Sequence, residues 1–160
     1  MSSAGAATSP QPTDEHRKLA ALAGEWAGEE MVYPSRWAEG GAAVSHVNAR
    51  VDLGGFYVLQ DYRQMRHGQT IFSGHGVFTF DRDDRLYKMF WHDSLGYFAP
   101  APASGGWKDD TLTLLRGSLR GAARHVFSFP DADTYTLTIQ FSPDAEGWSD
   151  VMTGVYRRLA

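Results

Sequence analysis

Residues 54–80 have the sequence GGFYVLQDYRQMRHGQTIFSGHGVFTF, in which a short polar turn separates two runs of alternating character. The runs at about 56–65 and 70–80 are rich in aromatic and β-branched residues, which favour strands. The turn Arg66-His67-Gly68-Gln69 contains the glycine typical of a hairpin, and Gly54-Gly55 is a second turn signal. This stretch therefore predicts a β-hairpin.

The same alternation continues along most of the chain. We expect further strands near residues 25–33, 43–53, 86–93, 96–100, 111–117, 122–129, 134–141 and 148–157. Because the intervening turns are short, consecutive strands should pair as an antiparallel meander. An open sheet leaves two edges with unpaired backbone groups, and closing the sheet removes both. The predicted fold class is all-β, an up-and-down antiparallel barrel of about ten strands, with an open sandwich as the alternative.

The N-terminal segment has a different composition. Residues 1–12 are mostly Ser, Ala, Gly and Pro without periodicity, and we predict that they form a disordered tail. Thr13 is a typical helix N-cap, and the acids that follow it suit the positive end of a helix. We expect a short helix from about 14 to 23 that ends at Gly24 and packs its leucine face onto the barrel. Residues 13–160 are then predicted to form a single barrel domain.

Composition excludes several classes of function. The net charge of −4, with acids and bases mixed along the chain, disfavours nucleic acid as a partner. The absence of cysteine excludes disulfides and thiolate chemistry and fits a reducing compartment. We find no apolar run long enough to span a membrane and no signal-peptide pattern, so we expect a cytoplasmic protein with no membrane partner. The expected partner is a small-molecule ligand, and the protein is expected to be a monomer or homodimer.

The strand pattern favours a barrel with an interior cavity. A strand that packs on a dry core usually carries only apolar groups on its inner face. Here both faces of residues 56–63 carry large or partly polar groups, with Phe56, Val58, Gln60 and Tyr62 opposite Tyr57, Leu59, Asp61 and Arg63. Tyrosine and tryptophan bury a large apolar body and keep a polar tip, which suits an interior that holds a partly polar ligand.

Trp91-His92-Asp93 is the densest cluster of candidate functional residues. Alternation places Trp91 and Asp93 on one face of a strand and His92 on the other. If Asp93 points inward, burial would raise its pKa and suit it to proton transfer or to binding a donor group. The alternative is that Asp93 caps the following turn.

His75 is the second candidate for chemistry. It lies between Gly74 and Gly76, and glycines inside a strand often mark a close approach to the backbone. His75 could therefore act as an acid, a base or an axial ligand, and the alternative is a solvent-facing histidine. His46 belongs to a polar row that we expect to be solvated.

Arg116 and the spacing of the histidines complete the set of candidates. Arg116 alternates with leucines and could be held partly inside, where it would require an anion; the alternative is a surface arginine. The six histidines show no spacing typical of a metal site, so we predict none, although two could meet across neighbouring strands. The chain contains no nucleophile elbow, phosphate loop or dinucleotide motif.

Several short motifs resemble those of the calycin superfamily, which includes lipocalins and fatty-acid-binding proteins. The chain has Gly24-Glu25-Trp26-Ala27-Gly28 after a short helix, Gly54-Gly55 between strands, and a Trp-x-Asp-Ser-x-Gly segment formed by Trp91, Asp93, Ser94 and Gly96. With these motifs the chain is most similar to a bacterial calycin-like family of uncharacterised function. The resemblance implies a calycin-like barrel over about residues 16 to 157 and says little about activity.

A more distant resemblance connects the chain to nitrobindins, which are ten-stranded haem-binding barrels. Trp26, Gly28, Tyr33 and Pro34 match part of their first-strand motif. The haem-ligating histidine near the C-terminus of that family has no counterpart, because the last histidine is His125. We therefore expect no cofactor, and haem with His75 or His92 as axial ligand is the alternative that this resemblance implies.

Two main hypotheses for function follow. The first is the binding of a small, mostly apolar ligand inside the barrel. The second is a cofactor-independent cyclase or isomerase acting there, with His75 or Asp93 as the group that handles protons. Whether the protein is an enzyme stays open at this point. The residues expected to contact the ligand are Trp26, Tyr57, His75, Trp91, Asp93 and Tyr156.

Overall fold

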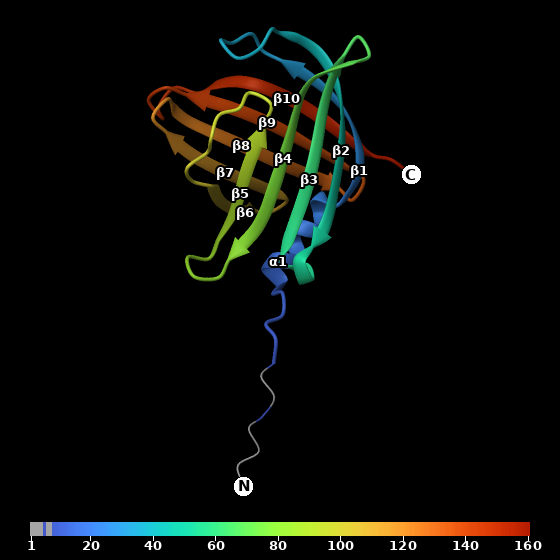
Figure 1. The fold of residues 1–160 in the computed structure, drawn as a ribbon, viewed down its shortest axis with the longest axis vertical. Coiled ribbons are helices and arrows are strands. Elements are labelled where there is room, and N and C mark those ends of the chain that lie inside the picture. The colour runs from blue at the N-terminus through green and yellow to red at the C-terminus, as the bar shows by residue number, and fades with distance from the viewer. Residues whose placement is uncertain (1–4, 6–7) are drawn as a thin grey trace.

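Ten antiparallel strands close into a barrel in the computed structural model, which describes residue 5 and residues 8–160 (Figure 1). Each strand pairs with its neighbours along the chain, and the first pairs with the last. This confirms the predicted up-and-down barrel. The strands are β1 (Gly24–Val32), β2 (Gly41–Asp52), β3 (Tyr57–Arg66), β4 (Gln69–Asp81), β5 (Leu86–Asp93), β6 (Ala103–Lys108), β7 (Thr111–Ser118), β8 (Gly121–Asp131), β9 (Thr134–Ser142) and β10 (Ser149–Arg158).

Alternation along the strands separates the interior of the barrel, the lumen, from its outer surface. In β1 the buried residues are every second one, Trp26, Gly28, Glu30 and Val32, and the residues between them are exposed. The strand-to-strand register extends this division, because Gly28 lies opposite Tyr156 of β10 and Ser45 of β2. Inward side chains at opposite positions of neighbouring strands therefore lie close together in the lumen, although they are far apart in the sequence.

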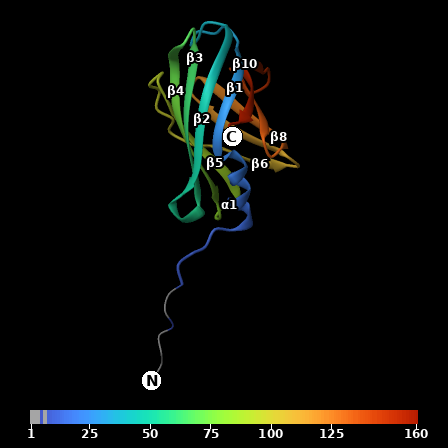
Figure 2. The same cartoon turned by 90° about the vertical axis from the view of Figure 1, so that its right-hand side faces the viewer.

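A short helical segment covers one end of the barrel, which we call the closed end (Figures 1 and 2). It consists of α1 (Asp14–Lys18) and a 3-10 turn, η1 (Leu19–Leu22). The predicted helix from about 14 to 23 is therefore an α-helix only in its first half. The tighter 3-10 turn places residues three apart on the same side, so Leu19 and Leu22 are both fully buried against the barrel.

Trp26 joins the closed end to the wall of the barrel. Its indole Nε1 donates a hydrogen bond of 3.0 Å to the carbonyl oxygen of Leu22, and its side chain has no exposed surface. The ring packs edge-on against Tyr135 at 4.7 Å, and the Arg158 guanidinium lies 4.2 Å from the centre of the indole ring. Trp26 therefore ties the last helical turn to β1, β9 and β10.

The opposite end, which we call the open end, carries longer connections. Residues 33–40 link β1 to β2 there, and residues 94–102 link β5 to β6. The strand predicted near 96–100 is wrong, because this stretch is a loop in the structure. Pro100 and Pro102 have no backbone N–H to donate to a neighbouring strand, which explains why the pairing resumes only at Ala103.

Two connections modify the barrel locally. A 3-10 turn, η2 (Leu53–Gly55), links β2 to β3 and uses Gly54 at a positive φ of 72°, as the predicted Gly-Gly turn requires. On the other side of the barrel, β5 pairs with β6 through only three residues, Tyr87 to Met89. The residues of β5 beyond Met89 border the loop 94–102 in place of a strand.

Two further expectations concern the N-terminal tail and a membrane-spanning segment. The tail predicted for residues 1–12 includes residues 1–4 and 6–7, which lie outside the described residues. Within the described part, no helix has the length and the hydrophobicity needed to cross a membrane.

Replacing Trp26 with Phe should destabilise the protein. The change removes the bond to Leu22 and leaves a buried carbonyl oxygen without a partner, so we expect the free energy of unfolding to fall by about 1–3 kcal/mol in urea titrations. Trp37→Phe, in the partly exposed loop 33–40, is the control and should cost less than about 1 kcal/mol. Equal losses in the two variants would contradict the role of Trp26.

Candidate functional site

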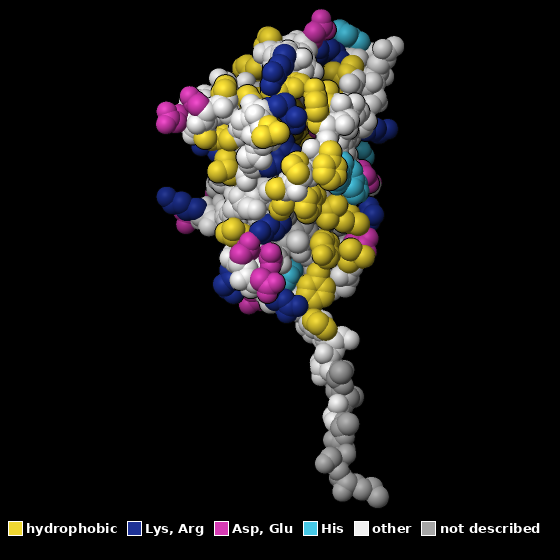
Figure 3. Space-filling view, turned by 60° about the vertical axis from the view of Figure 1, so that its left-hand side comes forward, with side chains coloured by type: hydrophobic (Ala, Val, Ile, Leu, Met, Phe, Trp, Pro, Cys, Tyr) yellow, Lys and Arg dark blue, Asp and Glu magenta, His cyan; other side chains and the backbone are white. Residues whose placement is uncertain are grey.

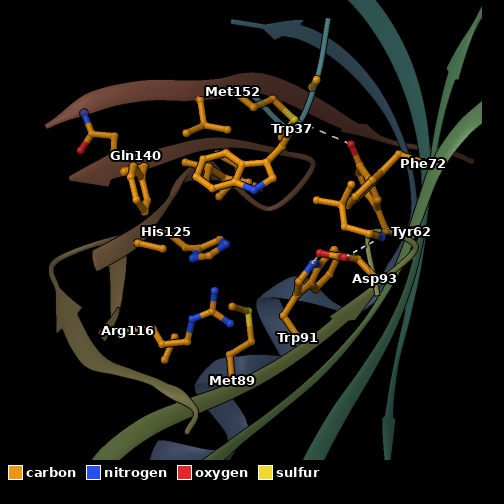
Figure 4. A pocket seen from close by; sticks show the side chains of 18 of the residues that line it. Trp37, Tyr62, Phe72, Met89, Trp91, Asp93, Arg116, His125, Gln140 and Met152 are labelled. Atoms are coloured by element: carbon orange, nitrogen blue, oxygen red, sulfur yellow. Dashed lines mark hydrogen bonds between the residues drawn. The ribbon is translucent and has the colours of Figure 1, made fainter. Parts of the chain in front are cut away.

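The lumen contains a cavity of about 270 Å³ that lies in the half of the barrel next to the open end. Its walls are mostly apolar and aromatic side chains, with residues from all ten strands, and the loops 33–40 and 94–102 form its rim. Figure 4 shows these side chains converging on one space from opposite walls. Small-molecule sites are typically concave, mostly apolar and about 300–1,000 Å³ in volume. The cavity is therefore close to the lower end of that range.

A buried carboxyl group organises one wall of this cavity. Glu30 is 5% exposed and accepts hydrogen bonds from the Tyr62 hydroxyl at 2.8 Å, from Gln64 Nε2 at 3.2 Å and from the Tyr156 hydroxyl. Burial raises the pKa of Tyr62 and of Tyr156, and the negative charge of Glu30 raises both further, so the two hydroxyls stay protonated donors. Because their protons point to Glu30, the tyrosine oxygens offer only lone pairs to a ligand.

Small residues make room for the aromatic side chains in this wall. A Cβ atom at Gly28 would lie 2.6 Å from the Tyr156 ring, and one at Gly154 would lie 2.8 Å from it. The Tyr156 ring therefore lies flat over two glycine positions and stacks on Tyr135 at 4.6 Å. The packing fixes the direction of its hydroxyl toward Glu30.

Trp91 is held in the same way on the opposite wall. A Cβ atom at Gly74 would lie 2.1 Å from the Trp91 ring, and one at Gly76 would lie 3.3 Å from it. The two glycines around His75 do mark a close approach to the backbone, but the group that approaches is Trp91. Its indole Nε1 donates a hydrogen bond of 2.9 Å to Asp93 Oδ2, drawn as a dashed line in Figure 4.

Asp93 caps the following turn, which is the alternative considered from the sequence, and its side chain also faces the cavity; a role in proton transfer stays a prediction. Its side chain lines the cavity, and its Oδ1 accepts a hydrogen bond of 3.0 Å from the backbone N–H of Leu95 in the following turn. With Oδ2 bonded to Trp91, each oxygen of the carboxyl group already has a donor. Asp93 therefore orients Trp91 and begins the loop 94–102 at the same time.

Arg116 and His125 form the polar part of the wall between β7 and β8. In the register, Leu114 lies opposite His125 and Arg116 lies opposite Ala123, so Arg116 and His125 are diagonal neighbours on the inner face. Figure 4 shows both side chains directed into the cavity. Of the two alternatives considered for Arg116, the structure shows the partly buried one, with the side chain in the cavity lining.

Burial changes the proton affinity of both groups. It lowers the pKa of Arg116, Arg120 lowers it further, and Asp93 acts in the opposite direction. Burial also lowers the pKa of His125 to about 4, and the charge of Arg116 contributes in the same sense. His125 is therefore neutral near pH 7, and its buried Nδ1 has no hydrogen-bond partner among the described residues.

The rim of the cavity is aromatic and positively charged. Trp37 packs edge-on against Phe141 at 5.1 Å, and the Arg120 guanidinium lies 4.5 Å from the centre of the Tyr97 ring. Phe98 is 79% exposed although it is part of the cavity lining. Figure 3 shows hydrophobic side chains and Lys or Arg side chains gathered together on the upper half of the face in view.

Three of the six residues expected to contact a ligand line the cavity, namely Trp91, Asp93 and Tyr156. Trp26 points inward but belongs to the packed closed end. Tyr57 follows the outward alternation of β3, whose buried residues are Val58, Gln60, Tyr62 and Gln64.

The sixth candidate, His75, lies on the outer surface of the barrel. Its Nδ1 is 2.8 Å from Asp61 Oδ1, and it lies opposite His92 of β5. Two histidines of neighbouring strands therefore lie opposite each other, but on the outer surface of the barrel and not in the lumen. Among the described residues no group of three or more His, Cys, Asp or Glu side chains is placed to hold a metal.

Sequence reasoning missed Glu30, Tyr62 and His125 as parts of the site. The signal for Glu30 was available, because it alternates with Trp26 and Gly28 on the inner face of β1. Tyr62 alternates with Val58 in the same way. His125 gave no comparable signal, because its position beside Arg116 depends on the register of β8 with β7, which a single sequence does not determine.

The residues do not fit the haem alternative. His75 and His92, the two proposed axial ligands, face away from the lumen. The cavity volume of about 270 Å³ is also below the usual range for sites of drug-sized ligands. The haem alternative with His75 or His92 as axial ligand is therefore not supported by where these two residues lie.

The fold and the site together define a class: closed, ten-stranded antiparallel barrels with one end covered by a helix and a cavity at the other. Within this class, the chain belongs to the family described as "Protein of unknown function (DUF1579)", whose model matches residues 11–158. No curated protein matches the chain.

Two solved structures share the fold at low sequence identity. Rv2717c from M. tuberculosis has a TM-score of 0.70 at 14% identity, and the match covers 92% of this chain and 99% of that one. The S-type phycobiliprotein lyase CPES from Guillardia theta has a TM-score of 0.64 at 14% identity, covering 93% of this chain and 99% of that one. At this identity the likeness concerns the fold alone.

Substituting Gly74 with Ala tests the placement of Trp91. The added Cβ would lie 2.1 Å from the indole ring, which has to move and lose its bond to Asp93. We expect a loss of about 1–3 kcal/mol in the free energy of unfolding and a changed tryptophan emission spectrum. Gly106→Ala in β6, where a Cβ meets nothing within 4 Å, is the matched control and should leave both unchanged. An unchanged spectrum in Gly74→Ala would show that Trp91 lies elsewhere.

His125 makes stability depend on pH. The unfolded chain binds a proton at the histidine near pH 6.5, whereas the folded protein binds it only near pH 4, so stability is lost as the pH falls between these values. His125→Phe removes this dependence. Relative to the wild type, the variant should gain about 2 kcal/mol in unfolding free energy between pH 7 and pH 5. His67→Asn, at an exposed turn, should follow the wild-type curve, and a similar slope in all three proteins would contradict the burial of His125.

Proposed function

We propose that this protein binds a small, mostly apolar molecule with one or two polar groups in the lumen of a calycin-like barrel. The observation that carries the proposal is the cavity of about 270 Å³, which is lined by aromatic and aliphatic side chains from opposite walls. A barrel of this size whose purpose was only to fold would fill its lumen with side chains.

The rigidity of the lining supports binding. The aromatic rings of Tyr156 and Trp91 lie over glycines, and their polar tips are fixed by Glu30 and Asp93. A wall whose side chains are already ordered loses little conformational entropy when a ligand enters. The apolar lining supplies affinity, and the few free polar groups supply orientation.

Binding is favoured over the cyclase or isomerase hypothesis by the state of the two candidate proton carriers. Both oxygens of Asp93 already accept hydrogen bonds within β5 and its loop. His75 lies on the outer surface in contact with Asp61. Neither is a free acid or base facing the cavity, whereas the cavity itself requires no further group to bind a ligand.

Filling the lumen tests the proposal. N-phenyl-1-naphthylamine is uncharged and fluoresces strongly in apolar surroundings, so we expect the wild type to enhance its emission in a saturable titration. Ile139 lines the cavity, and Ile139→Trp places a larger side chain in it. This variant should weaken probe binding by about tenfold or more, because the added ring occupies the volume that the probe needs.

The control for this experiment is the neighbouring position on the same strand. Thr138 alternates with Ile139 and lies on the other face of β9, outside the cavity lining. Thr138→Trp should therefore bind the probe as the wild type does. If the wild type shows no saturable enhancement, or if both variants bind equally, the lumen is not the binding site. Native mass spectrometry of the purified protein, with its denatured mass beside it, would identify any ligand that co-purifies.

A further inference from the structure

The polar groups in the lumen are distributed unevenly. On the wall of β1, β3 and β10, the donors of Tyr62, Gln64 and Tyr156 are all directed to Glu30. That cluster satisfies itself within the protein. On the wall of β7 and β8, Arg116 and His125 face the cavity without such internal partners.

Arg116 takes part in none of the ion pairs formed by the described residues. The carboxylate on the facing part of the wall is Asp93, and its two oxygens accept hydrogen bonds from Trp91 and from the Leu95 backbone. The charge of Asp93 acts on Arg116 without forming an ion pair with it among the described residues. A half-buried guanidinium without an ion pair or a hydrogen-bond acceptor has lost part of its hydration, and an anion that reaches it restores the lost interactions.

The charges of the cavity lining have the sign that an anion needs. The charged residues in the lining are two arginines, Arg116 and Arg120, and one acid, Asp93. The residues that line the cavity are thus net positive, although the chain as a whole has a net charge of −4. The carboxylate of Glu30 lies behind them, on the wall of β1, β3 and β10, where Tyr62, Gln64 and Tyr156 donate to it. Arg120 is exposed and lies over Tyr97 at the rim, whereas Arg116 lies deeper on the strand.

His125 is compatible with an anion bound at Arg116. It lies beside Arg116 on the inner face and is neutral near pH 7, because burial and the charge of Arg116 lower its pKa. It therefore contributes a polar ring edge and no second charge. Arg116 is left as the cation that selects the charge of the ligand in this part of the lumen.

Resting on the proposed function, we infer that the ligand is an organic acid whose carboxylate binds the guanidinium of Arg116 beside His125 while its apolar body lies among the aromatic side chains of the lumen. A planar guanidinium offers parallel N–H donors that match the two oxygens of a carboxylate. The length of the apolar body is limited by the cavity of about 270 Å³, which favours a medium-sized molecule.

The test compares an acid with its uncharged analogue. Decanoate and decan-1-ol have the same chain length, and each is titrated against bound N-phenyl-1-naphthylamine to measure its dissociation constant. The quantity of interest is the affinity of the acid divided by that of the alcohol. In Arg116→Met, which keeps an unbranched apolar stem and removes the charged guanidinium, we expect this ratio to fall by about tenfold or more. Because the acid and the alcohol are compared in the same variant, a general change in the lumen affects both and cancels in this ratio.

Two further variants test whether the carboxylate binds at Arg116 or at another arginine. Arg63→Met removes an arginine from the exposed outer face of β3 and should leave the ratio unchanged. Arg120→Met should reduce the ratio by less than Arg116→Met, because Arg120 is solvated at the rim. An unchanged ratio in Arg116→Met, or an equal or larger loss in Arg120→Met, would overturn the assignment while leaving the lumen as a binding site. Failure of the wild type to bind the uncharged probe would instead overturn the proposed function, and the acid site with it.

Discussion

The pairing of β1 with β10 is the constraint on which the remaining structure depends. It joins the first strand to the last, from Trp26 opposite Arg158 to Val32 opposite Met152, and so turns a meander into a closed wall. Once the wall is closed, each strand has one inner face, and a shift by one residue would exchange all inner and outer side chains. The placement of Glu30, Tyr156 and Trp91 in the lumen follows from this closure.

The buried carboxyl group of Glu30 shows how closure and site are connected. Its partners come from β3 and β10, so a single acidic residue links strands on both sides of β1. A buried acid without partners would be costly, and three donors offset that cost. The same contacts hold Tyr62 and Tyr156 in fixed orientations at the cavity wall, which means that a feature required for stability also shapes the candidate site.

Much of the fold could be predicted from the sequence, because alternation and turn residues are local signals. They predicted nine of the ten strands, the short N-terminal helix and the shared face of Trp91 and Asp93, all of which are found, whereas β6 was not predicted. The error near residues 96–100 arose where aromatic residues favoured a strand and Pro100 and Pro102 prevented the pairing.

The site was harder to predict, because the neighbours of an inward side chain lie on strands that are distant in the sequence. His75 seemed a strong candidate between two glycines, yet those glycines make room for Trp91 on the neighbouring strand. Arg116 and His125 become neighbours only through the register of β7 with β8. A single sequence shows the alternation of each strand and leaves the register between strands undetermined.

The limited pairing between β5 and β6 gives the barrel a seam. Three residue pairs join these strands, whereas nine join β2 to β3, so separating β5 from β6 breaks far fewer backbone hydrogen bonds. The seam lies beside the loop 94–102, next to Trp91 and Asp93. The backbone pairing of the wall is therefore weakest beside the cavity, so local opening of the barrel costs least free energy at the place where a bound molecule would contact it.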